Sequence, residues 1–297
     1  MTVHLRIHTA QQGMIPKQYP ESFQYPGGEW SLRNIPEIPS DQGAVTLIAD
    51  MRGADPHDLV KAALWSDVAD RANFWHAGRV DFAFVLMLPY LPAARADKGD
   101  TDRSPIGANV YSRLIRGLAA DQIITIDPHS SYMPRQFRNL KVASPVTLVR
   151  RALESSAPQF DAVICPDKGA IDRADAVAIM MGVPVYTCDK QRDLETGKIL
   201  GLKVPPLDPK KRYLVVDDIC DGGGTFALLA DKIGLPSKQL GLWVTHGIFS
   251  GRANELSKSY GWIGTTDSHP GHNRLGVATT IVPTFQAMYN VMNGANK

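Results

Sequence analysis

The sequence predicts an α/β protein of two domains, each a mainly parallel sheet flanked by helices. Short apolar runs of strand length alternate with segments whose apolar residues recur at helical spacing, which is the pattern of parallel sheets with crossover helices. Strands in both halves of the chain end in polar loops, so the two halves echo each other weakly. With 297 residues, 44% of them hydrophobic, the chain is long enough to form two such domains.

In the first half, the helix that follows the first strand has the clearest signals. Asp55 suits an N-cap and Pro56 suits the first helical position. Apolar residues between positions 59 and 68 recur at helical spacing. The run 82–88 is apolar throughout, as in a strand buried on both faces. The expected elements are strands at 45–49, 82–88 and 122–126 and helices at 56–73 and 110–118.

The second half repeats the alternation and adds a helical tail. The helix after residue 225 is expected to end at Gly234, because glycine favours the position that follows a helix. We expect a domain boundary near residues 142–144, which gives domains 1–143 and 144–282, with the tail 283–297 packed on the first domain. The expected elements are strands at 162–165, 184–187, 213–216 and 242–245 and helices at 174–181, 226–233 and 285–292.

The composition argues against several classes of function. A net charge of +2 with 21% charged residues offers no strongly charged surface for nucleic acid or for a membrane. The 3 cysteines are far apart and show neither a disulfide framework nor metal-binding spacing. No apolar run reaches membrane-spanning length, and the first residues lack the pattern of a signal peptide. We therefore expect a cytoplasmic protein that binds neither nucleic acid nor membrane.

The strongest functional signal is the stretch Tyr213-Leu-Val-Val-Asp-Asp-Ile-Cys-Asp-Gly-Gly-Gly-Thr225, which predicts a strand, an acidic glycine loop and a helix start. A helix N-terminus presents backbone N–H groups to an anion, and glycine lets the backbone approach it. Carboxylates at the carboxyl end of a strand suit ribose hydroxyls or magnesium. The stretch therefore predicts a site for a phosphorylated sugar, and the alternative is an ordinary acidic surface turn. The candidate residues are Asp217, Asp218, Asp221, Gly222, Gly223, Gly224 and Thr225.

This loop is neither a Walker phosphate loop nor a Gly-x-Gly-x-x-Gly motif. It resembles the phosphoribosyl-pyrophosphate (PRPP) loop of type I phosphoribosyltransferases and PRPP synthetases. Five further segments, all within residues 25–291, resemble PRPP synthetase (ribose-phosphate diphosphokinase) motifs in the same order. They are Pro89–Lys98, Asp127-Pro-His129, Pro166-Asp167, Asp189-Lys-Gln-Arg192 and Val244-Thr-His-Gly-Ile-Phe-Ser-Gly251.

The resemblance implies a phosphoribosyltransferase-like fold in both domains and transfer of the pyrophosphoryl group of ATP to the C1 hydroxyl of ribose 5-phosphate, with Mg²⁺ as cofactor. The family usually forms symmetric assemblies in which a neighbouring subunit completes the nucleotide site, so it also implies a homo-oligomer. The implied roles are magnesium binding by His129 and Asp167, charge stabilisation by Lys190 and Arg192, binding of the sugar hydroxyls by Asp217 and Asp218, 5-phosphate binding by residues 221–225, and ATP binding by Arg95, Asp97, Tyr25 and Glu29.

The sequence departs from the family pattern in the sugar loop and on the adenine side. The family usually has Asp-Thr-Ala-Gly-Thr where this chain has Asp-Gly-Gly-Gly-Thr, so Gly222 removes a hydroxyl and opens space. A larger acceptor such as ADP-ribose, giving ADP-ribose 1-pyrophosphate for NAD salvage, is therefore an alternative to ribose 5-phosphate. The segment Tyr25-Pro-Gly-Gly-Glu29 replaces Phe-Ser-Asp-Gly-Glu, and Ala96 replaces a glutamine.

Other interpretations remain open from the sequence. A type I phosphoribosyltransferase would use the same sugar loop, and a regulatory paralogue would keep the fold without the chemistry. His129 has an alternative as a polar strand end, and Asp167 has one as a helix cap. Lys190 and Arg192 have an alternative as a solvated charged turn. For His246, a buried structural role is the preferred interpretation.

Overall fold

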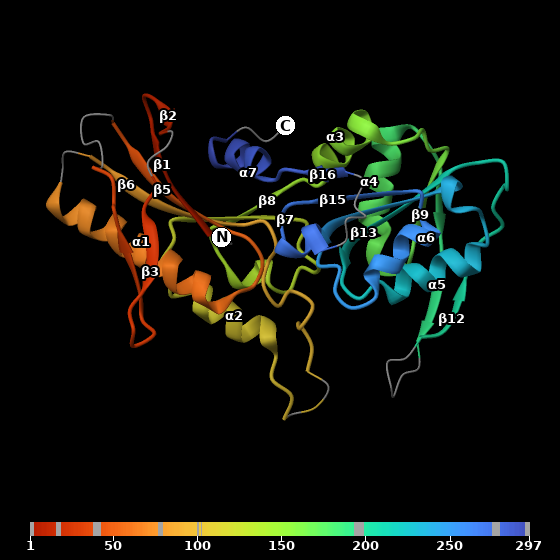
Figure 1. Ribbon diagram of the computed structural model, residues 1–297, viewed down its shortest axis with the longest axis horizontal. Helices are drawn as coiled ribbons and strands as arrows, with labels where there is room; N and C mark the ends of the chain where they lie inside the picture. Colours follow the sequence, from red (N-terminus) through yellow and green to blue (C-terminus); the bar gives the residue numbers. More distant parts are fainter. Residues whose placement is uncertain are drawn as a thin grey trace. The chain divides into compact units, whose positions relative to one another are not determined.

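The computed structural model describes residues 3–15, 19–37, 43–76, 80–99, 101, 103–192, 199–274 and 280–294, without the side chains of residues 190–192, 199 and 200. The chain divides into two compact units. Unit 1 comprises Met1–Ala143 and Phe285–Lys297, and unit 2 comprises Ser144–Thr284. Each unit is built around its own six-stranded sheet (Figure 1).

The sheet of unit 1 has the strand order β2-β1-β5-β6-β7-β8, in which β5 to β8 are parallel and β1 is antiparallel to both of its neighbours. Its strands are β1 (Val3–Thr9), β2 (Gly13–Met14), β5 (Val45–Met51), β6 (Phe82–Leu88), β7 (Gln122–Ile126) and β8 (Leu140–Ala143). A separate hairpin joins β3 (Glu21–Gln24) to β4 (Trp30–Arg33). The helices are α1 (Pro56–Trp75), α2 (Gly107–Arg116) and α7 (Phe285–Met292), with the short turn η1 (Pro134–Gln136).

Alternation along β1 explains how helices cover both faces of this sheet. Every second residue, starting at Val3, is buried in the core that α1 completes. The intervening side chains meet α7, where the Arg6 guanidinium lies 4.3 Å from the Phe285 ring centroid and the His8 ring lies 5.6 Å from that of Tyr289. Figure 1 accordingly shows α1 and α2 on one face and α7 on the other.

Helix boundaries in unit 1 follow the capping residues. Asp55 caps α1 by accepting a hydrogen bond from the His57 N–H, and Pro56 occupies the first turn, as predicted. The helix predicted at 110–118 is wrong at both ends, because α2 begins at Gly107 and ends at Arg116. The helix starts after Ile106, whose backbone is extended (φ −88°, ψ 98°). At its end, the Gly117 N–H donates to the Arg113 carbonyl at 3.1 Å.

The sheet of unit 2 is parallel throughout, with the strand order β10-β9-β13-β14-β15-β16. Its strands are β9 (Ala162–Cys165), β10 (Val185–Thr187), β13 (Tyr213–Cys220), β14 (Leu240–Gly247), β15 (Trp262–Thr266) and β16 (Thr280–Val282). A separate antiparallel hairpin joins β11 (Asp189–Arg192) to β12 (Ile199–Lys203). The α-helices are α3 (Val146–Ser156), α4 (Ile171–Met181), α5 (Gly224–Ile233) and α6 (Leu256–Ser259). The short turns are η2 (Lys168–Ala170), η3 (Ser237–Gln239), η4 (Ala253–Glu255) and η5 (Pro270–Arg274).

Helices cover both faces of this sheet as well. α3 and α4 pack together and against the sheet, and Phe226 and Leu229 of α5 share a buried cluster with Val215 and Leu242 on the other side. Because all six strands run in the same direction, the loops after β9, β13 and β14 leave the sheet at one edge. The predicted α/β class with two mainly parallel sheets is confirmed. Within the described residues, we find no helix with the length and apolar character needed to cross a membrane.

Candidate active site

The sugar loop of unit 2 joins the end of β13 to the start of α5, and it is shaped by its glycines. Gly223 occupies the N-cap of α5 with φ 78°, a left-handed conformation that glycine adopts most readily. A Cβ atom added at Gly222 or at Gly224 would have no other atom within 4 Å. The loop therefore exposes backbone at a helix N-terminus, which is the arrangement that binds phosphate.

The segment that follows β14 holds this loop in place. The backbone N–H groups of Ile248 and Phe249 donate to the carbonyl oxygen of Cys220, at 2.9 and 3.0 Å. The hydroxyl of Ser250 donates to Oδ1 of Asp221 over 2.6 Å. These hydrogen bonds come from residues 245–251, which the sequence analysis recognised only as a family motif. The segment thus helps to fix the position of the sugar loop.

The carboxylates of Asp217 and Asp218 are bridged by an arginine that the sequence analysis missed. Arg173 Nη1 lies 3.5 Å from Asp217 Oδ1, and its Nη2 lies 3.3 Å from Asp218 Oδ2. The backbone N–H of Asp218 also donates to Asp217 Oδ1 at 2.8 Å. Burial and the neighbouring Asp218 carboxylate raise the pKa of Asp217, and Arg173 opposes that rise.

Asp167 lies in the same unit, on the loop between β9 and α4. Its Oδ1 accepts a hydrogen bond from the Gly169 N–H at 3.0 Å, so it caps η2, which was the structural alternative for this residue. Its charge also makes a small contribution to the raised pKa of Asp217.

Carboxylate oxygens in general suit a hard cation, because magnesium prefers oxygen ligands and commonly uses one or two carboxylates together with substrate phosphates. Within the described residues, no group of three or more His, Cys, Asp or Glu side chains is placed so that it could hold a metal ion. A magnesium site here would therefore depend on the substrate for part of its coordination. The second candidate ligand, His129, belongs to unit 1.

In unit 1, Arg95 and Asp97 lie on the loop that leaves β6, and His129 lies on the loop that leaves β7. The Ser130 hydroxyl donates to Oδ2 of Asp97 at 2.8 Å and so joins the two loops. The structure thereby brings the Arg95–Asp97 segment beside the segment that carries His129. The Tyr132 hydroxyl, from the same β7 loop, donates to Oδ1 of Asn109 on α2 at 2.8 Å.

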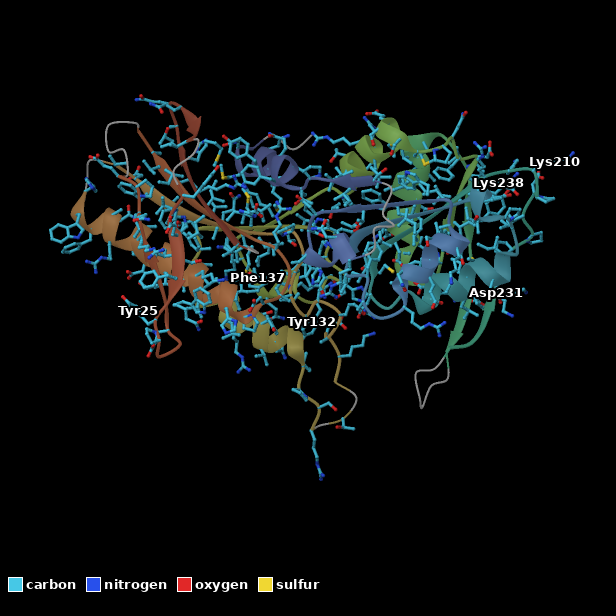
Figure 2. All side chains as sticks on the ribbon, in the orientation of Figure 1. Tyr25, Tyr132, Phe137, Lys210, Asp231 and Lys238 are labelled. Atoms are coloured by element: carbon cyan, nitrogen blue, oxygen red, sulfur yellow. The ribbon has the colours of Figure 1, made fainter. Side chains whose placement is uncertain are left out.

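Tyr25 and Glu29 lie at the turn of the β3–β4 hairpin. The Tyr25 N–H donates to the Glu29 carbonyl at 2.8 Å, and Gly28 has φ 102°. Next to the turn, the Trp30 ring contacts α1, where its centroid lies 4.2 Å from Lys61 Nζ. The Tyr25 side chain, labelled in Figure 2, is 51% exposed, and its ring meets that of Phe23 on β3 edge to face, with 4.9 Å between the ring centroids. The tip is therefore available to a ligand or to another chain.

Lys190 and Arg192 lie on β11, where Lys190 pairs with Leu202 of β12 and the register shifts between Gln191 and Arg192. Their side chains lie outside the described residues. The backbone thus places both residues on a two-stranded hairpin separate from the main sheet of unit 2. Their predicted roles remain predictions.

Two histidines lie close to the sugar loop. His246 is 2% exposed and its Nδ1 lies 2.8 Å from the Ser268 hydroxyl, which confirms the structural interpretation. The Gly271 N–H donates to Nδ1 of His269 at 3.0 Å, so this nitrogen carries no proton. Burial and the nearby Arg274 lower the pKa of His269 to about 4.

This lowered pKa predicts how stability depends on pH. Between pH 6.5 and about 4 the unfolded chain binds a proton at His269 that the folded protein does not, so the free energy of unfolding should fall as the pH is lowered. His269→Asn keeps an acceptor for the Gly271 N–H and removes the titration. Urea midpoints at a series of pH values should therefore fall less steeply in the variant, and equal slopes would contradict this assignment.

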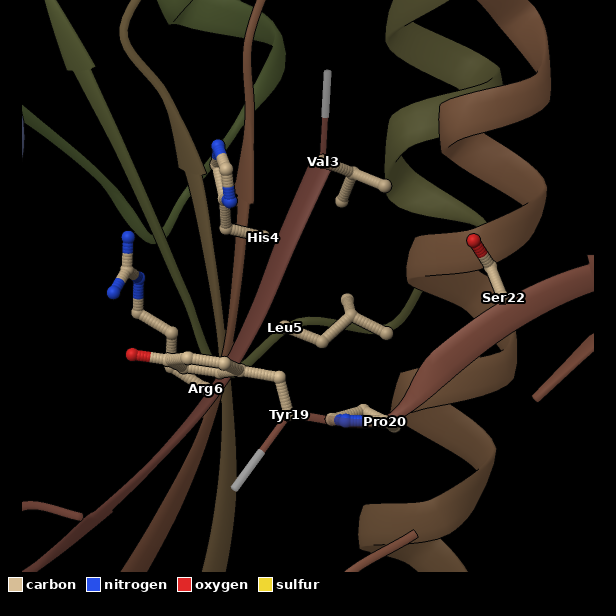
Figure 3. Close-up of a pocket in the computed structure, with 7 residues that line it drawn as sticks. All are labelled: Val3, His4, Leu5, Arg6, Tyr19, Pro20 and Ser22. Atoms are coloured by element: carbon tan, nitrogen blue, oxygen red, sulfur yellow. The ribbon is translucent and has the colours of Figure 1, made fainter. Parts of the chain in front are cut away.

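A pocket in unit 1 contains none of the predicted site residues. It encloses about 170 Å³ beside β1, and its lining residues are Val3, His4, Leu5, Arg6, Tyr19, Pro20 and Ser22 (Figure 3). Arg6 lies 5.8 Å from the Tyr19 ring centroid and 4.0 Å from the buried Asp50, which also pairs with Arg52 at 3.0 Å. Arg6 and Arg52 therefore both contact the Asp50 carboxylate.

Comparison with known proteins supports the resemblance seen in the sequence, although no family model matches the chain. A ribose-phosphate pyrophosphokinase from Cereibacter sphaeroides is 30% identical over 242 residues, which cover 77% of this chain and 70% of the relative. One from Pyrococcus abyssi is 26% identical over 256 residues, 84% of each chain.

A solved structure shows the same fold. Phosphoribosylpyrophosphate synthetase from Mycobacterium smegmatis matches 93% of this chain and 89% of its own, with a TM-score of 0.68 and 20% identity. At that identity the match supports the architecture of the chain and not its substrates. Together with the sequence relatives, it shows that the chain belongs to the ribose-phosphate pyrophosphokinase family.

Proposed function

We propose that this protein transfers the pyrophosphoryl group of ATP to the C1 hydroxyl of ribose 5-phosphate in a magnesium-dependent reaction that yields PRPP and AMP. The observation that carries the proposal is the end of β13 in unit 2. There, two carboxylates bridged by Arg173 directly precede an open glycine loop at the start of α5. One short segment thus offers acceptors for a sugar diol and donors for a phosphate.

In this proposal the acceptor sugar binds to unit 2. Asp217 and Asp218 accept hydrogen bonds from the 2- and 3-hydroxyls. The backbone N–H groups of residues 221–225 and the Thr225 hydroxyl bind the 5-phosphate, helped by the partial positive charge of the α5 N-terminus. The Ser250–Asp221 hydrogen bond supports this role, because it fixes the first residue of the loop.

The nucleotide in this proposal is bound by Arg95 and Asp97 on the β6 loop and by Tyr25 and Glu29 on the hairpin. The hairpin would serve the ATP of a neighbouring subunit in a homo-oligomer, and the exposed Tyr25 side chain supports that assignment. His129 and Asp167 would hold Mg²⁺. When bound, this ion neutralises charge on the triphosphate and polarises its phosphoryl oxygens.

The proposed reaction is an in-line displacement at the β-phosphorus of ATP. The C1 oxygen forms a bond to that phosphorus while the bond to the bridging oxygen of the α-phosphate breaks. AMP leaves, and the C1 hydroxyl loses its proton. The protein mainly positions the reactants and neutralises charge, which is the role assigned to Lys190 and Arg192.

A second candidate acceptor is ADP-ribose, which has the same diol and a larger 5-substituent. The observation that favours it is the open space at Gly222, where an added Cβ would meet no atom within 4 Å. The chemistry at C1 would be unchanged, and the product would be ADP-ribose 1-pyrophosphate.

Gly222→Thr should shift the balance between the two acceptors. The added hydroxyl supplies a hydrogen bond to the charged 5-phosphate, worth about 1.5–3 kcal/mol. The KM for ribose 5-phosphate should therefore be lower by roughly 10- to 150-fold. The extra bulk should at the same time lower kcat/KM for ADP-ribose. Steady-state kinetics with both acceptors measures the change, with Gly222→Ala as the control that adds bulk without a hydroxyl. Identical KM values for ribose 5-phosphate in the Thr and Ala variants would contradict the proposed contact.

The deciding experiment for the function is ³¹P NMR with ATP and magnesium, offering ribose 5-phosphate and ADP-ribose in separate samples. AMP together with a C1-pyrophosphate on ribose 5-phosphate would support PRPP synthesis. The same signals with ADP-ribose alone would support the second candidate. No AMP in either sample would contradict both and favour a phosphoribosyltransferase or a regulatory paralogue.

A further inference from the structure

We propose that Arg173 is a positioning residue that gives the site its selectivity for a sugar with a cis-diol. The inference rests on the proposed sugar role of Asp217 and Asp218 and adds a residue outside the predicted site. Arg173 would act through these two carboxylates and would not touch the reacting atoms.

The geometry is that of one guanidinium shared between two acids. Nη1 faces Asp217 at 3.5 Å and Nη2 faces Asp218 at 3.3 Å, so each nitrogen serves a different carboxylate. The three side chains are 11%, 17% and 7% exposed, respectively, which keeps water from screening the pairs. The guanidinium is planar and rigid, so it also fixes the spacing of the two acids.

Rigid elements hold both sides of this contact. Arg173 lies in the first turn of α4, and α4 packs against β9 and β13 through a buried face that includes Ala174 and Val177. The two aspartates lie within β13, where Asp217 pairs in register with Val244 of β14. Helix and strand therefore set the position of the guanidinium relative to the acids without help from a loop.

The contacts also fix the rotation of each carboxylate. Oδ1 of Asp217 faces Arg173 and accepts the Asp218 N–H at 2.8 Å, while Asp218 faces Arg173 through Oδ2. Without the guanidinium, nothing would hold the two adjacent carboxylates at this spacing, and their mutual repulsion would turn them apart. Two acceptors that have turned apart no longer point at two neighbouring hydroxyls.

Selectivity for a diol requires both carboxylates to keep this orientation. A buried site built to bind a hydroxyl rejects the analogue that lacks it, because the site's own polar groups are then left without partners. A carboxylate that has turned away no longer imposes this penalty. Loss of Arg173 should therefore weaken binding of ribose 5-phosphate much more than binding of 2-deoxyribose 5-phosphate.

The test compares these two sugars in wild type, Arg173→Met and Arg173→Lys. Arg151→Met, at an exposed arginine of α3 in the same unit, is the matched control. Calorimetry without ATP gives the two affinities, and AMP release with ATP gives kcat and KM for each sugar. We expect Arg173→Met to lower the ratio of the affinities at least tenfold, mainly through a higher KM for ribose 5-phosphate. Arg173→Lys should fall between Met and wild type, and Arg151→Met should match wild type.

Unchanged selectivity in Arg173→Met, or in Arg173→Lys if the Met variant does not fold, would overturn the inference. A wild-type protein with no preference for ribose 5-phosphate would overturn it as well. If wild type binds ribose 5-phosphate selectively, through Arg173, but releases no AMP, the proposed function fails and the inference stands. If wild type makes PRPP and Arg173→Met keeps its selectivity, the inference fails and the function stands.

Discussion

Lys190→Ala is expected to lower the turnover of this protein by about 10²–10³-fold, because a positioned charge that stabilises the transition state is commonly worth about 3–4 kcal/mol. As the bond to AMP breaks, its electron pair stays on the oxygen that leaves with AMP, and a cation on β11 would stabilise the negative charge that develops there. Ribose 5-phosphate affinity, measured by calorimetry, should stay close to wild type. The rate is measured as AMP release at saturating substrates.

Lys203→Ala is the matched control for this prediction. Lys203 is an exposed lysine on β12, and it pairs in register with Asp189, the residue before Lys190. Its removal changes the charge of the same hairpin by the same amount and should leave the turnover near the wild-type value. A Lys190→Ala variant with a normal rate would show that Lys190 belongs to a solvated charged turn, as the sequence also allowed.

The local part of the sugar site could be predicted from the sequence, because it depends on residues that are neighbours in the chain. Four apolar residues, two acids, three glycines and a helical pattern specify strand, loop and helix in order, and the structure has β13, the loop and α5 in these places. The strand is longer than the predicted 213–216, however. β13 continues to Cys220, because Asp217, Ile219 and Cys220 still pair with β14.

The support of this loop could not be predicted in the same way, because it comes from distant parts of the chain. Between Arg173 and the strand of Asp217 lie the rest of α4, the strand β10 and the β11–β12 hairpin, and nothing in the local pattern of Arg173 marks it as a partner of the two acids. One signal was available. Arg173 directly precedes the helix predicted at 174–181, and it lies in the first turn of α4, which begins at Ile171. A polar side chain at the start of a helix that follows a strand of the sheet lies near the carboxyl ends of the strands, where ligands bind.

Some of the elements that the sequence analysis missed have a weak local pattern, although β1 alternates clearly between buried and more exposed residues. β15 contains Trp262 and Gly264 within five residues, and β16 has only three residues. Strands this short form because neighbouring strands supply their hydrogen bonds, so tertiary context and not propensity decides them. The β3–β4 hairpin is held by Trp30 packing on Lys61, a contact between segments that lie far apart in the chain.

Gly271→Ala is expected to destabilise unit 2 by about 1–3 kcal/mol, the usual cost of forcing a methyl group into a packed interior. A Cβ atom at Gly271 would overlap the carbonyl group of Ile248, and backbone cannot move aside as a flexible side chain can. Urea unfolding followed by the fluorescence of the buried Trp243 and Trp262 measures the loss. Gly222→Ala, where the new methyl meets no atom within 4 Å, should change the free energy of unfolding by no more than about 0.5 kcal/mol.

The same substitution should also weaken binding of the sugar phosphate, because the contacts form a chain that leads to the site. Gly271 packs on Ile248, the Ile248 N–H donates to the Cys220 carbonyl at 2.9 Å, and Cys220 directly precedes Asp221 of the sugar loop. Displacing Ile248 therefore disturbs its hydrogen bond to Cys220 and shifts the sugar loop, although Gly271 itself does not contact the phosphate. We expect a raised KM for ribose 5-phosphate with a kcat that changes less. A variant that loses stability but binds the sugar as wild type does would show that the loop keeps its shape without the segment after β14.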